Sequence, residues 1–149
     1  MMADAFFKQL DGKLAALKSA EAAAADRKAS NRAFAAKALA DLRPIADEYA
    51  SRLNERGIKA KVSGNDYGLS FELRWSNGDD HSLSVASESD ANRLKIVRHS
   101  TDHTTGKRYQ STDGTTYDAS SWKASHFEVA VQGLIDDYVT LADKHGGLP

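Results

Sequence analysis

The chain has 149 residues and a formal net charge of −1; 41% of the residues are hydrophobic and 8% are aromatic. This length suits a single domain, and the composition excludes a wholly disordered chain. The sequence contains no cysteine, which excludes disulfide scaffolds, cysteine zinc sites, iron–sulfur clusters and thiol nucleophiles. It has neither an apolar run of the ~18 residues that cross a bilayer nor the apolar core of a secretory signal. We expect a single α+β domain spanning residues 1–149 and a cytoplasmic location.

The first third of the chain is predicted to be helical, because residues 3–56 are rich in the strong helix formers Ala, Leu, Lys, Glu and Arg. An apolar stripe with spacings of three and four residues marks one helical face near the start. The stripe fades over residues 25–31 and returns between Ala35 and Leu53. Its first part consists of Phe7, Leu10, Leu14 and Leu17.

Two arrangements of this third remain open. Ser30 or Asn31 could cap a second helix, so that residues 1–30 and 31–56 fold back as a hairpin. Alternatively, one helix of about 50 residues would be ~75 Å long and would overhang its domain as an arm. No Gly or Pro lies between Lys13 and Arg43, which favours continuity. Pro44 is expected to kink or restart the helix.

Residues 57–119 are predicted to form an antiparallel meander sheet of four to six strands, because apolar residues alternate with polar ones. A three-residue turn at 76–78 would place Phe71 opposite Leu83 and keep one face apolar, whereas a two-residue Asn77-Gly78 turn would mix the faces. We further expect Val85 to pair with Leu94, and residues 107–110 and 115–118 to form a final edge hairpin.

A C-terminal helix is predicted over residues 125–145, opened by a capping box from Ser125 to Glu128. Its apolar face is expected to pack on one face of the sheet. The predicted core comprises Leu42, Ile45, Tyr49, Leu53, Ile58, Val62, Leu69, Phe71, Leu73, Leu83, Val85, Leu94, Ile96, Phe127, Val131, Leu134 and Tyr138.

The residue patterns associated with catalysis are weak in this sequence. His99 and His103 have metal-pair spacing only if they lie on a helix, and they fall in a predicted strand end and turn. Asp79 and Asp80 precede His81 but follow a glycine turn, where we expect them to be hydrated. The sequence lacks a nucleophile elbow, a phosphate loop and a dinucleotide fingerprint. We therefore assign no catalytic residue, metal ligand or cofactor and lean against an enzyme.

The leading functional hypothesis is a non-enzymatic protein–protein interaction or oligomerisation module, with a homodimer or a partner helix covering the amphipathic N-terminal helix. One alternative is a small-ligand-binding protein or enzyme with a site at the sheet edge. A second is weak nucleic-acid binding through Lys and Arg on the outer sheet face, although the sequence has no basic stripe; we expect no membrane partner. The candidate interaction residues are Phe6, Phe7, Leu10, Leu14 and Leu17. The candidate ligand residues are Tyr109, Tyr117, Trp122, His99 and His103. The outer-face residues are Lys59, Lys61, Glu72, Arg74, Arg93 and Lys95.

Overall fold

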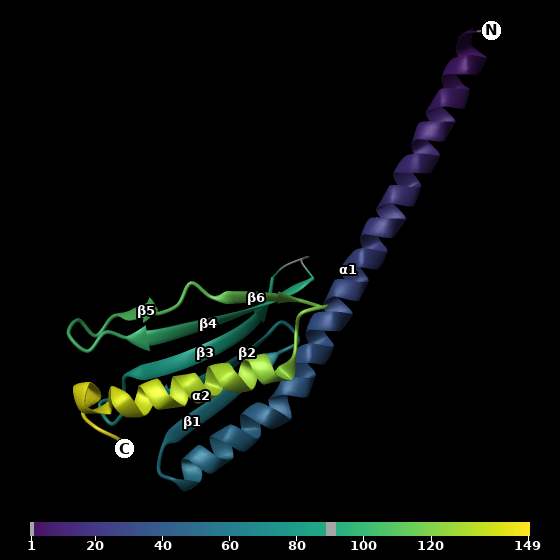
Figure 1. Cartoon of the computed structure of the whole chain (residues 1–149). Coiled ribbons are helices and arrows are strands. Elements are labelled where there is room, and N and C mark those ends of the chain that lie inside the picture. The colour runs from purple at the N-terminus through teal and green to yellow at the C-terminus, as the bar shows by residue number, and fades with distance from the viewer. Residues whose placement is uncertain (1, 89–91) are drawn as a thin grey trace.

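The structure is a computed structural model that describes residues 2–88 and 92–149. It has the predicted α+β class, with a long N-terminal helix, an antiparallel sheet and a C-terminal helix (Figure 1). The elements in chain order are α1 (Met2–Glu55), β1 (Lys59–Asn65), β2 (Gly68–Arg74), β3 (Asp80–Ser87), β4 (Arg93–Thr101), β5 (Arg108–Gln110), β6 (Thr115–Asp118), α2 (Ala124–Thr140) and the short 3-10 helix η1 (Ala142–His145).

Helix α1 is continuous, so the hairpin alternative is wrong. It has 54 residues, which corresponds to about 81 Å, and Ser30 and Asn31 lie inside it without interrupting it. Pro44 also lies inside the helix and does not restart it. The helix bends where it covers the sheet (Figure 1), and a proline removes one backbone hydrogen bond there.

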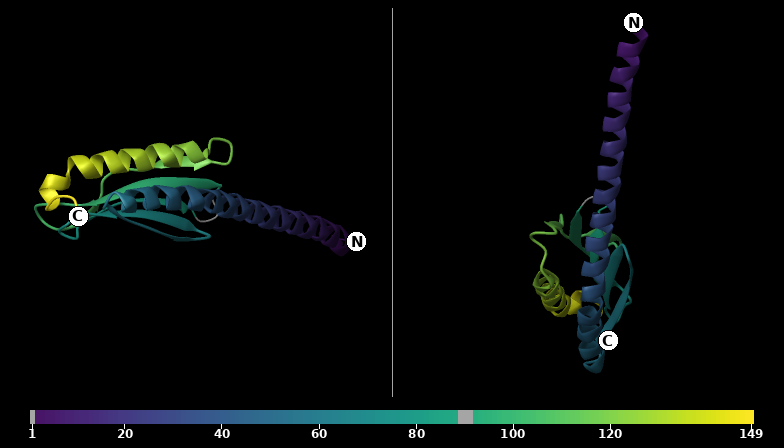
Figure 2. Two further views of the ribbon diagram at one scale, coloured as in Figure 1. Left: turned by 90° about the horizontal axis from the view of Figure 1, so that it is seen from below. Right: turned by 90° about the vertical axis from the view of Figure 1, so that its right-hand side faces the viewer.

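Only the C-terminal part of α1 packs on the sheet. The buried residues of this helix all lie between Ala35 and Leu53. Residues 2–33, which we call the arm, project beyond the sheet as an extended rod in every view (Figures 1 and 2). At 1.5 Å per residue the arm is about 50 Å long.

The hairpin of β2 and β3 has the predicted register. The strands follow the order β1-β2-β3-β4-β5 and all neighbours are antiparallel. The turn between β2 and β3 has three residues: the Trp75 N–H donates to Asp79 O at 3.0 Å, and Gly78 has a φ of 90°. Phe71 accordingly faces Leu83. The inner face of the sheet therefore stays apolar.

The predicted register of β4 is wrong by two residues. Val85 pairs with Ile96 rather than with Leu94, and Leu94 pairs with Ser87. A shift of two residues keeps the same side chains on the inner face, because side chains alternate with a period of two. Hydrophobic alternation therefore identified the face correctly but could not choose between registers two residues apart.

The predicted final hairpin does not form. β5 and β6 do not pair with each other; both pair with β4, at its C-terminal and N-terminal ends respectively. Strand β4 has nine residues, which is long enough to accommodate both short segments along one edge. Between them the chain passes close to β4 at Gly114, whose φ is 92° and where a Cβ would lie 3.2 Å from Ile96 O.

The two helices share the inner face of the sheet and contact each other. Gln132 of α2 donates to the Tyr49 hydroxyl of α1 at 2.9 Å. Most of the predicted core is buried, but Ile58 and Val62 are only half-buried because they lie at or beside the edge strand β1. The other half-buried members of the predicted core are Ile45 and Tyr49.

The predicted capping box of the C-terminal helix is wrong. Helix α2 begins at Ala124 with Lys123 as its N-cap residue, and no side chain caps it. The preceding turn sets this start: Asp118 O accepts from the Trp122 N–H at 2.9 Å, and the Asp118 carboxylate accepts from the Ser121 N–H at 2.9 Å. Ser125 consequently lies within the first turn. Helix α2 ends at Thr140 and η1 follows.

We predict that Leu42→Ala lowers the free energy of unfolding by about 3 kcal/mol, because the Leu42 side chain is fully buried and its loss leaves a cavity. Urea unfolding of dilute protein measures this effect. The matched control is Leu14→Ala on the arm of the same helix, which should change stability by less than about 0.5 kcal/mol. Equal losses for the two variants would contradict an arm that is unpacked within its own chain.

Candidate interaction surface and polar clusters

The arm carries large apolar side chains that its own domain does not cover. We call Phe6, Phe7, Leu10, Leu14 and Leu17 the arm stripe. Phe6, Phe7, Leu14 and Leu17 are between 45% and 59% exposed, and Leu10 is half-buried. The hydrophobic core of the described residues, with the side chains packed against it, begins only at Phe34. The predicted interaction residues are thus all accessible from outside the domain.

The arm stripe lies on the same side of α1 as the surface that packs on the sheet. Successive residues of an α-helix are rotated by about 100°, and on this basis the mean direction of the stripe lies within about 40° of the direction of the buried residues of α1. Glu21 and Lys28 fall on this side between the two regions. The arm therefore extends the apolar side of the helix past the end of its sheet.

Phe6 and Phe7 occupy opposite flanks of the arm stripe. Their ring centroids are 5.3 Å apart in an edge-to-face arrangement, which is a favourable geometry for an aromatic pair. Adjacent residues point about 100° apart on a helix, so these rings widen the apolar surface to both sides of the leucines. A partner helix lying on the leucines would contact both rings.

The sequence-predicted ligand residues do not converge on one site. Tyr117 and Trp122 lie together with His126: the Tyr117 ring stacks on His126 at 4.3 Å and meets Trp122 edge-on at 5.6 Å. His126 Nε2 is 3.1 Å from Ser121 O. The rings of this cluster thus contact one another and the turn before α2.

The remaining three ligand candidates lie elsewhere. Tyr109 pairs with Ser100, whereas Tyr117 pairs with Leu94; six residues along β4 separate these positions by about 20 Å. Ser100 pairs with the inward-facing His81, so its neighbour His99 lies on the outer face of the sheet. Burial lowers the pKa of His99, and the Arg108 charge lowers it further. His103 lies in the loop before β5, with its ring 6.0 Å from that of His145.

A buried aromatic cluster around Trp75, which the sequence analysis did not identify, joins the end of the chain to the sheet. The Trp75 ring stacks on His145 at 3.7 Å and on Tyr138 at 5.1 Å. The Trp75 Nε1–H donates to Tyr138 O at 2.9 Å, and the Tyr138 hydroxyl donates to Arg74 O at 2.6 Å. The alternation of β2 predicts an inward Trp75, but no sequence signal indicated that His145 would cover it.

The expectation that Asp79 and Asp80 are hydrated is wrong, and they do not act as a pair. Asp79 Oδ2 lies 2.8 Å from His145 Nδ1, and this hydrogen bond lowers the pKa of Asp79. Asp80 accepts from Arg108 Nε at 3.1 Å and from the Thr101 hydroxyl at 3.0 Å. Their side chains are only 23% and 13% exposed. One carboxylate therefore fixes the C-terminal turn and the other fixes β5.

His81 is a buried histidine with one unsatisfied nitrogen. Its Nδ1 lies 3.1 Å from Ser100 Oγ, and Nε2 has no hydrogen-bond partner among the described residues. Burial lowers the pKa of His81 to about 4, and the Arg98 charge adds to this effect. The ring is therefore neutral at pH 7. The alternation of Leu83 and Val85 along β3 already places position 81 on the inner face.

Arg98 is a charged residue on the inner face of β4. Its guanidinium bonds Asp137 Oδ2 at 2.7 Å and Ala130 O at 3.2 Å, both on α2. Helix α2 accommodates this group at Gly133, where a Cβ would collide with the Arg98 Nη2 atom. The glycine thus allows a close charged contact between helix and sheet, and this contact anchors α2.

The outer sheet face is mixed in charge. Glu72 and Arg74 form an ion pair at 2.9 Å, and Arg108 Nη2 reaches over the face to donate to the Ser82 hydroxyl at 2.9 Å. Lys61 pairs directly with Glu72 across the β1–β2 ladder. These contacts neutralise part of the basic charge that the nucleic-acid alternative requires.

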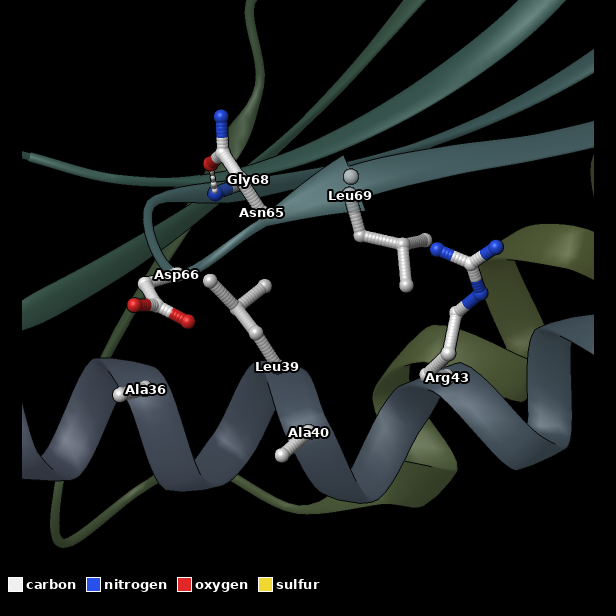
Figure 3. A pocket seen from close by; sticks show the side chains of 9 residues that line it. Ala36, Leu39, Ala40, Arg43, Asn65, Asp66, Gly68 and Leu69 are labelled. Carbon is white, nitrogen blue, oxygen red and sulfur yellow. Dashed lines mark hydrogen bonds between the residues drawn. The ribbon is translucent and has the colours of Figure 1, made fainter.

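A small open hollow of ≈ 170 Å³ lies between α1 and the β1–β2 turn (Figure 3). Small and aliphatic side chains form much of its wall, with Arg43 and Asp66 at its sides. Arg43 already bonds Asp47 at 3.2 Å, and Asn65 Oδ1 accepts from the Gly68 N–H at 3.2 Å. The polar groups of the hollow are thus partly committed to the protein itself.

We predict that stability decreases as the pH falls from 7 to 4, because the unfolded state protonates His81 near pH 6.5 whereas the folded state does so only near pH 4. The contribution is up to about 3 kcal/mol, at 1.36 kcal/mol per pKa unit. His81→Asn, which does not titrate, should lack this part of the slope in urea unfolding. The charged or titratable groups near the ring are Arg98, Asp137, Asp80 and His145.

An NMR titration of the His81 ring in the unmodified protein provides an independent check. A ring that protonates near pH 6.5 in the folded state would contradict its burial as a neutral group.

Comparisons with known proteins assign no identity to this arrangement. No protein-family model matches the chain, and neither the curated proteins nor the solved structures contain a significant match. Within residues 2–88 and 92–149, no group of three or more His, Asp or Glu side chains is placed to hold a metal ion. In the same residues, neither helix contains a segment apolar enough to pass through a bilayer.

Proposed function

We propose that this protein is a non-enzymatic protein–protein interaction or oligomerisation module, and that the arm of α1 pairs with a helix of another polypeptide. One observation carries the proposal: four of the five large apolar side chains of the arm stripe are about half exposed on a helix that extends some 50 Å past its own core. Large apolar groups gathered on one exposed face indicate an interaction site.

The arm has the properties of a preformed binding element. Forming the first turn of a helix is costly, but adding residues to an existing helix is not. The sheet-bound part of α1 supplies the existing helix, and ion pairs such as Lys37–Asp41 at 3.0 Å support it. A partner would therefore bind a helix that is largely ordered in advance, which lowers the entropic cost of association.

The small-ligand alternative has less support, because its candidate residues are distributed over both ends of β4 and a loop. The nucleic-acid alternative has less support as well, because Glu72 and Asp80 lie among the basic side chains of the outer face. Four of the ten large hydrophobic side chains that are exposed among the described residues belong to the arm stripe.

We predict that the full chain self-associates with increasing concentration and that the double variant Leu10→Gln/Leu14→Gln weakens this association at least tenfold. Glutamine keeps the helix propensity of leucine but removes its apolar surface. Sedimentation velocity over a range of concentrations measures the change in mass. The matched control, Ala16→Gln/Ala23→Gln, introduces the same polar groups on the opposite face of the arm and should leave the association unchanged.

Two results together would overturn the proposal. The first is a full chain that remains monomeric at every concentration. The second is a Leu10→Gln/Leu14→Gln variant with the same solubility and stability as the unmodified protein. The arm stripe would then affect neither the association nor the solubility and stability of the protein.

A further inference from the structure

We infer that the arm pairs with the arm of a second copy of this chain in an antiparallel orientation centred on Gly12. This inference rests on the proposed function and specifies its partner and geometry. In this alignment the two copies contribute the same surface, as a two-fold symmetric interface requires. Leu10 packs against Leu14 of the second copy, and Phe7 packs against Leu17 of the second copy.

The position of the sheet excludes a parallel pairing of this surface. The arm stripe faces the same side of α1 as the sheet, within about 40°. A second helix running parallel along the stripe would continue into the space that β1 and β2 occupy beside α1, since the core that they share with the helix begins near Phe34. Figure 1 shows the sheet flanking α1 directly below the arm. The parallel arrangement therefore clashes with the domain.

The antiparallel arrangement avoids this clash. With Gly12 at the centre, Met2 of the second copy lies opposite Ala22, twelve residues before Phe34. At 1.5 Å per residue this leaves about 18 Å between the end of the second helix and the first core residue. The two sheets then lie at opposite ends of the paired arms, where they do not compete for space.

The charged residues on the apolar side support the same orientation. Glu21 continues the spacing of the arm stripe, and a parallel in-register pair would place it against Glu21 of the second copy in the seam. Two like charges in a contact seam repel each other and lose solvent. In the antiparallel alignment Glu21 meets Ala3 of the second copy instead. The two Glu21 carboxylates then lie at separate points along the seam and do not face each other.

The charges that flank the seam do not reverse this preference. In the antiparallel alignment Lys13 lies near Lys13 of the second copy, and Asp11 lies near Asp11 of the second copy. In the parallel alignment each Lys13 lies near Lys18 of the other copy. These pairs are solvent-exposed, so each contributes only a few tenths of a kcal/mol. Steric exclusion and the Glu21 contact are therefore the larger effects.

The size of the stripe sets the expected strength of the dimer. Burying the exposed parts of five large side chains in each copy removes on the order of 900 Å² from water, given the areas typical of such side chains. Stable interfaces bury at least about 1,200 Å² in total. We therefore expect a reversible dimer with a Kd in the micromolar range.

Single spin labels distinguish the possible arrangements. Because the chain has no cysteine, Ser19→Cys and Ser30→Cys each introduce one label, and both positions lie on the face of the arm opposite the stripe. Antiparallel pairing centred on Gly12 predicts axial separations between like labels of about 21 Å at position 19 and about 54 Å at position 30. Parallel pairing predicts the same short separation at both positions. Double electron–electron resonance on concentrated full-length protein measures the label-to-label distance, in which a similar lateral spacing of the labels adds to the axial separation at both positions.

The outcomes separate the inference from the proposed function. A larger distance at position 30 than at position 19, lost from both sites when Leu10→Gln/Leu14→Gln is added, supports the antiparallel dimer. Equal short distances at positions 19 and 30 that are lost in the Leu10→Gln/Leu14→Gln variant overturn the antiparallel orientation but remain consistent with the proposed interaction module. Distances that persist in the stripe variant overturn both, because another surface then forms the dimer. A monomer without any distance overturns the self-pairing directly.

Discussion

The difference in length between α1 and the sheet is the constraint on which the rest of this account depends. The longest strand among the described residues, β4, has nine residues and spans about 30 Å, whereas the helix of 54 residues spans about 81 Å. A sheet that is less than half as long as the helix cannot contact the helix over its whole length. Some 50 Å of helix must therefore lie outside the domain, and the domain leaves its apolar side chains exposed.

The domain holds the base of this helix firmly. Leu42 and Ala46 are fully buried in a core that also contains the inner faces of β2, β3 and β4. Elsewhere in the core, the Trp75 ring stacks on both His145 and Tyr138, so that the end of the chain packs against the sheet. A base held on several sides gives the arm a fixed direction, which is what a pairing surface with defined geometry requires.

The sequence predicted features that depend on periodicity and missed features that depend on contacts between distant segments. Alternation identified the inner faces of the strands, and the need for a one-sided core correctly selected the three-residue turn at Ser76–Gly78. Alternation could not fix the β4 register, because shifts of two residues preserve the face. It also could not show that β5 and β6 both use the edge of β4, or that His145 would cover Trp75. The sequence does not decide between a helical hairpin and one continuous helix, because Ser30 and Asn31 are compatible with both a cap and a helix interior.

Hydrogen exchange of the arm amides at different protein concentrations tests the central claim most directly. We expect the amides of residues 6–18 to exchange faster in dilute protein than the amides around Leu42 and to gain protection as concentration rises, whereas the amides around Leu42 stay equally protected throughout. This pattern would show that the arm is covered by another chain and not by its own domain. Protection of residues 6–18 that equals the protection around Leu42 at every concentration would contradict the account, because the domain itself would then stabilise the arm as firmly as its buried base.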